Sequence, residues 1–224
     1  MALDGTLGAT GGGVTAVAVA SPGSFLEPGR RRVRSGARPG RPYRCAVQTI
    51  IRPRRDDDLP GCVAALRIVQ RQDAYPLVWP ADPVGWLCPN GVLDAWVCTI
   101  GDEVVGQLLL RDGSDLELRD AVAGAARLPA ARLASVSRLF VAPRARGTGA
   151  GARLIDTAVA AAADRGRRCA LDVLDARWGG PTALYERLGW RRVATTSASW
   201  WTGPDADRPV VHSYLAPDRT RVAP

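Results

Sequence analysis

Three glycines within five residues stand between an apolar run and a helical pattern in this chain. The apolar run ends at Val141, the helical pattern begins near Ala152, and between them lie Gly147, Gly149 and Gly151. Glycine lets the backbone approach a ligand closely and adopt conformations that other residues avoid. A helix that begins at such a turn presents unpaired N–H groups and the positive end of its dipole. The segment therefore predicts a strand–turn–helix unit with a binding site for a diphosphate.

Two arginines, Arg144 and Arg146, precede these glycines and add cationic donors to the predicted site. The glycines also allow two other interpretations. They fit the G-x-G-x-x-A pattern of dinucleotide-binding folds, with Asp172 or Asp175 roughly 20 residues further on, although that pattern normally opens the first of several βαβ units. They also fit a turn that only permits tight packing of a helix against a strand. A Walker A loop is excluded because the chain contains no lysine.

Strand and helix patterns alternate along the rest of the chain. We expect strands at residues 49–52, 95–100, 104–110, 134–141, 169–174, 190–201 and 209–215. We expect helices after the acidic residues 56–58, at 152–165 and at 181–188, with a loop or short helices at 74–90 and a long loop at 111–132. This order predicts an α/β (α+β) fold with a central twisted sheet and helices on both faces.

Positive charge is concentrated at the start of the chain. Residues 1–55 contain ten arginines against two acids, whereas residues 56–224 contain twenty of each. Domains that bind nucleic acid need a basic face, so only the arginine run at 30–34 is a candidate for contact with RNA or another anion. Glycine and proline breaks predict a disordered tail at 1–46, a folded domain at 47–217 and a short tail at 218–224.

Cysteine and histidine are too few and too widely spaced for a zinc site of the usual kind. The five cysteines form no CxxC pair, and His212 is the only histidine. We therefore expect no metal, and reduced, mostly buried thiols. A hydrolase would have to use His212, and the chain contains no nucleophile-elbow motif to go with it.

No stretch reaches the roughly 20 apolar residues of a membrane span, and the apolar run near the start lacks the basic residues of a secretory signal. We expect a soluble, cytoplasmic protein with no membrane partner.

Two segments resemble the signatures of the GNAT (GCN5-related) N-acetyltransferase superfamily. Residues 137–143, Ser-Arg-Leu-Phe-Val-Ala-Pro, followed by Arg144-x-x-Gly147-x-Gly149, resemble its acetyl-CoA signature. Residues 183–190, Ala-Leu-Tyr-Glu-Arg-Leu-Gly-Trp, are similar to its second signature. The resemblance spans about residues 49–216 and is strong over 134–192. It implies a GNAT-like mixed, mostly antiparallel sheet of about six or seven strands. It also implies an N-acetyltransferase that moves an acetyl group from acetyl-CoA to a primary amine by direct attack in a ternary complex.

The resemblance also implies roles for individual residues. The backbone at 139–141 would pair with the pantetheine arm as an added strand does. Tyr185 would protonate the leaving thiolate, since such a group departs more readily beside an acid. The alternative is that Tyr185 only packs beside Leu184 and Leu188. The implied cofactor-binding residues are Leu139, Phe140, Val141, Arg144, Arg146, Gly147, Thr148, Gly149, Ala150, Gly151 and Trp178.

The chain departs from the family pattern at two places. Trp178 stands about where the family often has an asparagine that touches the cofactor. The signature strand offers Ser135 and Ser137 where many members have a glutamate base. A protonated amine must lose a proton before it attacks. The base would then be a water chain, Asp172 or Asp175, or a residue of the loop at 79–86.

Aromatic residues indicate where an acceptor amine, on a small molecule or a peptide, would bind. Tyr75, Trp79, Asp82 and Trp86 lie after the first predicted helix, and Trp200 and Trp201 lie in the predicted penultimate strand. The tryptophans could form an acceptor wall or only cap the core, and Asp82 could anchor an amine.

Two other functions stay open: an acyl-CoA-binding sensor without catalysis, which the missing strand glutamate suggests, and a dinucleotide-binding oxidoreductase. Pairing into a homodimer is open as well.

Overall fold

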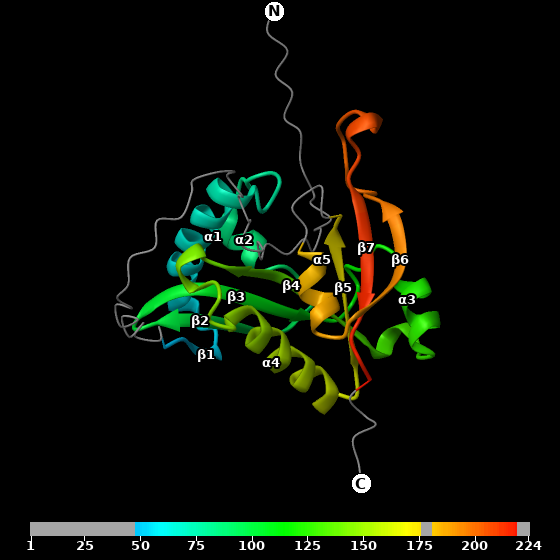
Figure 1. Ribbon diagram of the computed structural model, residues 1–224, viewed down its shortest axis with the longest axis horizontal. Helices are drawn as coiled ribbons and strands as arrows, with labels where there is room; N and C mark the ends of the chain where they lie inside the picture. The colour runs from blue at the N-terminus through cyan, green and yellow to red at the C-terminus, as the bar shows by residue number, and fades with distance from the viewer. Residues whose placement is uncertain (1–47, 176–180, 219–224) are drawn as a thin grey trace, which may run out of the picture.

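One seven-stranded sheet runs through the computed structural model, which describes residues 48–175 and 181–218 (Figure 1). The strand order is β1-β2-β3-β4-β5-β7-β6, and only the neighbours β4 and β5 are parallel. The strands are β1 (Ile50–Pro53), β2 (Val92–Ile100), β3 (Glu103–Arg111), β4 (Leu133–Val141), β5 (Arg168–Leu174), β6 (Arg191–Ser197) and β7 (Val210–Leu215). The α-helices are α1 (Leu59–Asp73), α2 (Pro83–Leu87), α3 (Arg119–Ala126), α4 (Ala150–Asp164) and α5 (Thr182–Arg187). The predicted fold class is confirmed.

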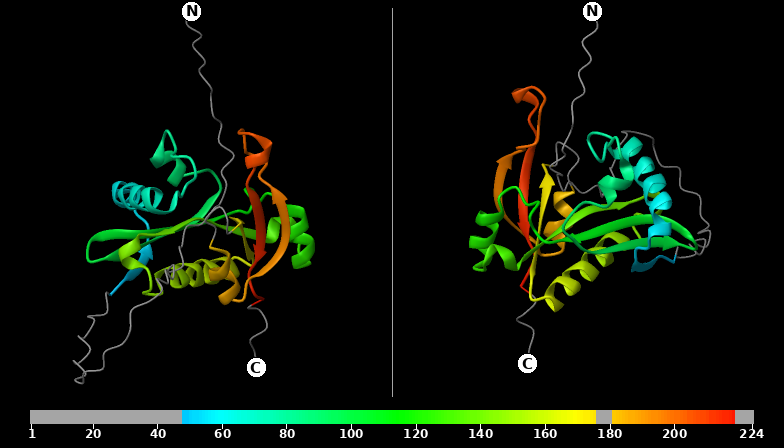
Figure 2. Two further views of the ribbon diagram at one scale, coloured as in Figure 1. Left: turned by 45° about the horizontal axis from the view of Figure 1, so that its top comes forward. Right: turned by 180° about the vertical axis from the view of Figure 1, so that it is seen from behind.

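Helices cover both faces of the sheet (Figure 2). α1 packs on β3 and β4 from one side, called here the α1 face, and α4 packs on β2 to β5 from the other, the α4 face. On α1, Cys62, Leu66 and Val69 recur at helical spacing and bury against Val97 and Phe140. The apolar stripe of α4 is buried against the opposite side of the same strands. Because the central strands are covered on both faces, they appear in the sequence as continuous apolar runs.

β4 and β5 pair only near their starts. Their last Cα partners are Ser135 and Ala170, and beyond that point the two strands diverge (Figure 1). A bulge lies in β4 at the same place, because β4 has one residue more than β3 between two of their pairs. Arg138 in this bulge has a φ of 51°, a left-handed value that is uncommon outside glycine. We call the region between the diverging parts of β4 and β5 the split.

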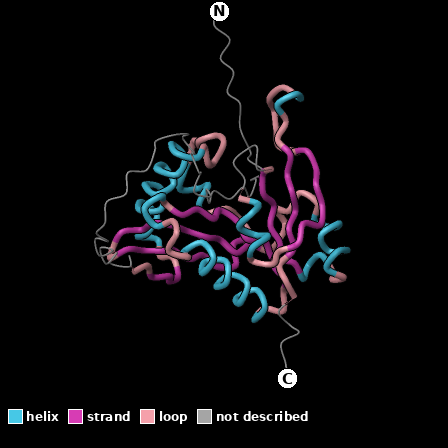
Figure 3. Tube along the Cα trace, in the orientation of Figure 1, coloured by secondary structure: helices cyan, strands magenta, loops and turns pink. Residues whose placement is uncertain are grey.

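Two of the expected elements differ from the structure. The segment 111–132 contains α3 in place of a continuous loop, because its alanines favour a helix that buries one side against the β6–β7 end of the sheet. β6 ends at Ser197, and the next residue, Ala198, is buried and donates its N–H to the carbonyl of Pro209 at 2.8 Å. Trp200–Trp201 therefore lie in the loop between β6 and β7, and not in the strand (Figure 3).

Among residues 48–175 and 181–218, no helix is both long enough and apolar enough to cross a bilayer. Of the described cysteines, Cys62, Cys98 and Cys169 are buried and Cys88 is exposed, and all four are free thiols. The expected tails fall largely outside the described ranges, so the division of the chain into a domain and two tails stays a prediction.

Candidate active site

The turn after β4 exposes its backbone at two glycines. A 3-10 turn at Pro143–Ala145 follows the strand, and Gly147 and Gly149 then have φ values of 75° and 80°. A Cβ built on either glycine would meet no atom within 4 Å, so open space lies outside both. Other residues are strained at such φ values even where space exists. The turn thus exposes main chain directly before α4 begins at Ala150.

The main-chain N–H groups of this turn have no hydrogen-bond acceptor within the described part of the chain. In the described part of the chain, the N–H groups from Gly147 to Ala152 donate to no carbonyl or side chain, whereas Arg153 begins the helical ladder by donating to Gly149. No side chain caps the start of α4. Free N–H groups at the positive end of a helix dipole make an anion site. The turn therefore fits the diphosphate that the sequence predicts for it.

The two arginines of the turn are engaged elsewhere. Both guanidinium Nη atoms of Arg146 contact the carboxylate of Asp73 at the end of α1, and its Nε donates to the carbonyl of Val141 at 3.2 Å. Its own N–H donates to the carbonyl of Pro143. Arg144 forms an exposed ion pair with Glu103. Arg146 thus ties the turn to α1, and the N–H groups without a partner among the described residues begin at Gly147.

Tyr185 of α5 is buried on the α4 face. It has no exposed surface, and its hydroxyl has no partner among the described residues. Its ring lies 5.7 Å from that of Trp190 and 5.9 Å from that of Tyr214, centroid to centroid. Burial raises the pKa of the phenol well above its ordinary value, so the hydroxyl keeps its proton. Tyr185 belongs to the same buried cluster as Leu139 of β4 and Val173 of β5, and its helix α5 lies at the gap between these two strands (Figure 1).

The strand residues expected to bind pantetheine lie along the split. Leu139 and Val141 belong to the core on the α4 face, and Phe140 to the core on the α1 face. All three lie beyond the last β4–β5 pair. The carbonyl of Val141 already accepts the hydrogen bond from Arg146. Trp178, also expected here, lies outside the described residues.

Asp172 of β5 lies on the α1 face, two residues beyond the last β4–β5 pair. Only 1% of it is exposed, and its carboxylate accepts hydrogen bonds from the hydroxyl of Ser213 and the N–H of Glu117, each at 2.6 Å. Burial raises its pKa to about 6, although both hydrogen bonds lower it. At neutral pH it is a carboxylate that binds a proton readily, as a general base must.

Asp175, the other candidate base, directly follows β5 and faces the opposite side of the sheet. Its carboxylate lies 3.0 Å from Nε2 of His212, and Nδ1 of His212 lies 2.9 Å from the hydroxyl of Thr195. His212 pairs across the ladder with Val173, whose side chain is in the α4-face core. The structure thus places the two predicted carboxylates on different faces. The contacts of His212 could not be predicted, because they depend on the register of three strands.

Aromatic residues expected at the acceptor site gather on the α1 face. The rings of Tyr75 and Trp86 meet edge to face at 6.0 Å. The guanidinium of Arg138 lies 4.0 Å from the centre of the Trp86 ring, and its Nε donates to the carbonyl of Trp86 at 3.0 Å. Trp79 is partly buried and carries Arg67 on its ring at 4.6 Å.

Two further residues, Asp82 and Arg138, lie near these aromatic side chains. Asp82 is exposed and caps α2 by accepting the N–H of Gly85 at 3.0 Å, and its contact with an amine stays a prediction. Arg138 was not predicted, because only the bulge in β4 turns its side chain toward Trp86. The available signal was that Arg138 is the one charged residue in a strand whose other residues are apolar or serine.

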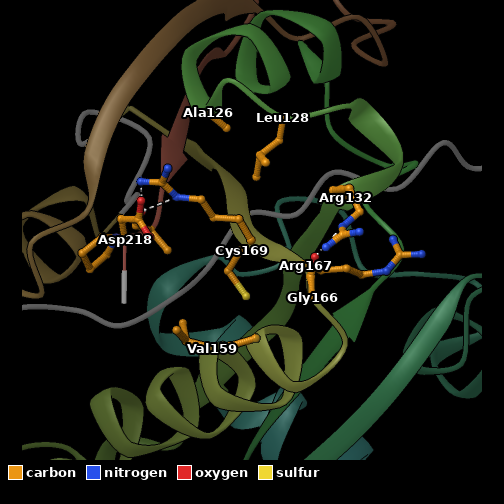
Figure 4. A pocket seen from close by; sticks show the side chains of 12 residues that line it. Ala126, Leu128, Arg132, Val159, Gly166, Arg167, Cys169 and Asp218 are labelled. Atoms are coloured by element: carbon orange, nitrogen blue, oxygen red, sulfur yellow. Dashed lines mark hydrogen bonds between the residues drawn. The ribbon is translucent and has the colours of Figure 1, made fainter. Parts of the chain in front are cut away.

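A separate cavity of about 230 Å³ lies at the other end of α4 (Figure 4). Arg132 and Arg167 lie at one end of it and Asp218 at the other, with Val159 below. The arginines donate to carbonyls: Arg132 to Gly166 at 2.6 Å and Arg167 to Leu133 at 2.8 Å. The cavity borders the first residues of β5, whereas the glycine turn follows the last residue of β4. It is therefore a different place from the predicted diphosphate site.

Comparison with known proteins shows what this chain is similar to. Residues 93–192 match the family model described as an acetyltransferase (GNAT) domain. No curated protein sequence matches the chain significantly.

Among solved structures, the ribosomal-protein-S18-alanine N-acetyltransferase of Escherichia coli is 16% identical, with a TM-score of 0.53 over 76% of this chain and 94% of that one. NAA60 of Arabidopsis thaliana, in complex with a bisubstrate analogue, is 17% identical, with a TM-score of 0.57 over 75% and 97%. An acetyltransferase from Streptococcus agalactiae is 18% identical, with a TM-score of 0.54 over 75% and 97%. At these identities the structures establish a shared fold.

Proposed function

This chain belongs to the GNAT acetyltransferase family, and we propose that it moves an acetyl group from acetyl-CoA to a primary amine by direct attack in a ternary complex. One observation carries the proposal. The unpartnered N–H groups of the turn lie at the end of β4, and an unpartnered phenol, Tyr185, lies beside the split that begins within the same strand. A diphosphate on the turn and a thioester in the split would satisfy both sets of donors.

The two faces of the sheet separate the two substrates. The turn, α4 and Tyr185 are on one face, so CoA would enter there and reach into the split. Asp172 is on the other face, where α1 and α2 pack, so the amine would approach the thioester from that side. The amine would attack the thioester carbonyl from the side of Asp172, and the tetrahedral intermediate would then expel the thiolate toward Tyr185.

Each proton in the reaction has a residue to hold it. Asp172 takes one proton from the ammonium of the acceptor, directly or through a water. The free amine then attacks the thioester carbon, the C–N bond forms and the C–S bond breaks. The thiolate takes the proton of Tyr185, and the phenol regains a proton from the new amide nitrogen. Burial raises the pKa of Tyr185, so the phenol still holds its proton when the thiolate leaves.

The test is thiol release from acetyl-CoA by the full chain across a panel of primary amines. We expect release with at least one class of amine, and thermal stabilisation by acetyl-CoA but not by NAD or NADP. Stabilisation by acetyl-CoA without turnover on any amine would favour an acyl-CoA sensor. Stabilisation by a dinucleotide alone would favour an oxidoreductase.

A further inference from the structure

Tyr75, in the loop that directly follows α1, carries a second buried phenol. The residue is only 5% exposed, and its hydroxyl has no hydrogen-bond partner among the described residues. Native proteins rarely leave such a group unpaired, because the loss of its bonds to water is then not compensated. A phenylalanine would fill the same space without that cost. The hydroxyl therefore calls for a hydrogen-bond acceptor that arrives with a ligand.

The contacts of Tyr75 place it next to the bulge of β4. Its ring meets that of Trp86 edge to face at 6.0 Å, and the carbonyl of Trp86 accepts a hydrogen bond from Nε of Arg138 at 3.0 Å. Arg138 is the bulge residue at which the split begins. Tyr75 also belongs to the same buried cluster as Phe140 of β4 and Leu174 of β5. It thus packs on the α1 face, near the place where these two strands diverge.

The phenols of Tyr75 and Tyr185 lie on opposite faces of the sheet and still influence each other. Burial is the main cause that raises the pKa of Tyr185, and the charge of an ionised Tyr75 adds to it. Such an interaction weakens with distance, so the two phenols lie near each other across the sheet. Burial raises the pKa of Tyr75 by more than the nearby charge of Arg138 lowers it, so this hydroxyl keeps its proton as well.

Attack of an amine on a thioester places negative charge on two atoms in turn. As the C–N bond forms, the π electron pair of the carbonyl moves to its oxygen. When the tetrahedral intermediate collapses, that pair returns, the C–S bond breaks and the charge passes to sulfur. A donor fixed beside each atom stabilises the charge that develops there. The proposed function assigns Tyr185 to the sulfur and assigns no side chain to the oxygen.

The acceptor amine does not provide a partner for the hydrogen of Tyr75. An ammonium has hydrogens to donate but no lone pair, and the free amine uses its lone pair in the attack. A carbonyl oxygen has two lone pairs, and it arrives with acetyl-CoA whichever amine is bound. The thioester oxygen is therefore the atom that best matches this donor.

We propose that Tyr75 is a further catalytic residue, whose hydroxyl donates a hydrogen bond to the oxygen of the thioester carbonyl and strengthens that bond as the oxygen becomes negative. The inference rests on the proposed function. Tyr75 transfers no proton, whereas Tyr185 gives its proton to the departing thiolate. The two hydroxyls thus act in succession on two atoms of one functional group, from opposite faces of the sheet.

Tyr75→Phe in the full chain tests the role, with thiol release from acetyl-CoA as the assay. We expect kcat to fall by about a hundredfold or more, as for removal of one donor to an oxyanion. KM for the amine and the dissociation constant for acetyl-CoA should stay nearly unchanged, because the bond is strong only in the transition state. The melting temperature of the free protein should not fall, since the hydroxyl has no partner in the described structure.

Exchange of one substrate atom locates the contact. In the CoA ester of dithioacetic acid, sulfur replaces the carbonyl oxygen, and sulfur is a weak hydrogen-bond acceptor. Tyr75→Phe should therefore lose much less of its rate with the dithioester than with acetyl-CoA. Tyr185→Phe is the matched control, because the leaving sulfur is the same in both substrates, and it should lose the same factor with each.

Failure of the inference can be told apart from failure of the proposed function. Tyr75→Phe with the parent's kcat would overturn the inference and leave the acetyltransferase intact. A raised KM for the amine at unchanged kcat would overturn it as well, by assigning the hydroxyl to the acceptor. Equal losses with thioester and dithioester would separate Tyr75 from the carbonyl oxygen. Absence of thiol release by the parent with every amine would overturn the proposed function and this inference with it.

Discussion

At the scale of single residues, the site is marked by polar groups that the fold leaves without partners. The hydroxyl of Tyr185 is buried in an aromatic cluster in which Tyr214 instead donates to Glu186 at 3.0 Å. A phenylalanine would fill the same space without an unpaired O–H. The free protein therefore gains nothing from this hydroxyl, and a ligand atom in the split is the partner that would use it.

Tyr185→Phe tests that role. The variant should be at least as stable as the parent without ligand, because it loses only an unpaired donor. Its kcat should fall by about a hundredfold, which is typical for removal of a general acid, while the dissociation constant for acetyl-CoA stays the same. Thermal unfolding and steady-state thiol release measure the two effects. A variant with the parent's kcat would show that Tyr185 only packs.

The pH dependence of turnover tests Asp172. Its pKa is raised to about 6, so kcat/KM should rise as the pH increases through about 6 and the carboxylate becomes able to accept a proton. Asp172→Asn should lower kcat/KM by about a hundredfold and abolish this acidic limb. Asp175→Asn, three residues further along the chain, is the matched control, and it should keep the acidic limb. An unchanged profile in Asp172→Asn would assign the base elsewhere.

The raised pKa of Asp172 also has a consequence for stability. A carboxyl group whose pKa is higher in the folded state binds its proton more tightly there, so its contribution favours folding below pH 4 and is lost as the pH rises through about 6. The parent should therefore lose stability relative to Asp172→Asn between pH 4 and pH 8. Denaturant unfolding of both proteins at these two pH values measures the difference. A constant difference would show that the carboxyl is not perturbed.

At the scale of elements, the strand–turn–helix unit could be predicted because its signals are local. Glycines at positive φ and an apolar stripe at helical spacing are visible within the one segment that forms the unit. The partners of its arginines could not be predicted. Asp73 and Glu103 come from α1 and β3, far away in the sequence, and only the folded sheet brings them to the turn. The bulge at Arg138 is likewise set by pairing with β3.

Variants at two glycines with similar backbone conformations can distinguish a loss of ligand binding from the effect of backbone strain. Gly149 and Gly101 both have positive φ, 80° and 57°, and open space where a Cβ would be. Gly149→Val and Gly101→Val should therefore carry similar strain, about 1–2 kcal/mol. Only Gly149→Val should abolish stabilisation by acetyl-CoA, because its side chain blocks the turn. Thermal shift compares them, and equal losses of ligand response in the two variants would remove the turn from the binding site.

At the scale of the whole molecule, the sheet separates the groups of the proposed site onto its two faces. Its order and its split place the nucleotide-binding turn and Tyr185 on the α4 face and Asp172 and Tyr75 on the α1 face. The sequence could indicate the order of the elements and the α4-face residues. The alternation of side chains along a strand already places Asp172 and Asp175, three residues apart, on opposite faces, but the sequence could not indicate the networks that bind each carboxylate.

Acetyl-CoA should stabilise the entire domain, because the turn, α4 and the split are parts of one core. At a hundredfold excess over its dissociation constant, the ligand should add about 2.7 kcal/mol, which corresponds to a rise of roughly 5–10 °C in melting temperature. Differential scanning fluorimetry of the full chain measures this. A rise confined to millimolar acetyl-CoA and matched by simple diphosphate would indicate nonspecific anion binding.

The most direct measurement is the response of individual backbone amides to CoA, followed by NMR on the isotope-labelled chain. The signals from Gly147 to Ala152 should shift most, and they should stay in place when pantetheine without the diphosphate is added. Gly166, beside the separate cavity, should not respond to either ligand. If the turn signals stay fixed while those around Gly166 or elsewhere move with CoA, the main-chain diphosphate site, and the active site built upon it, is wrong.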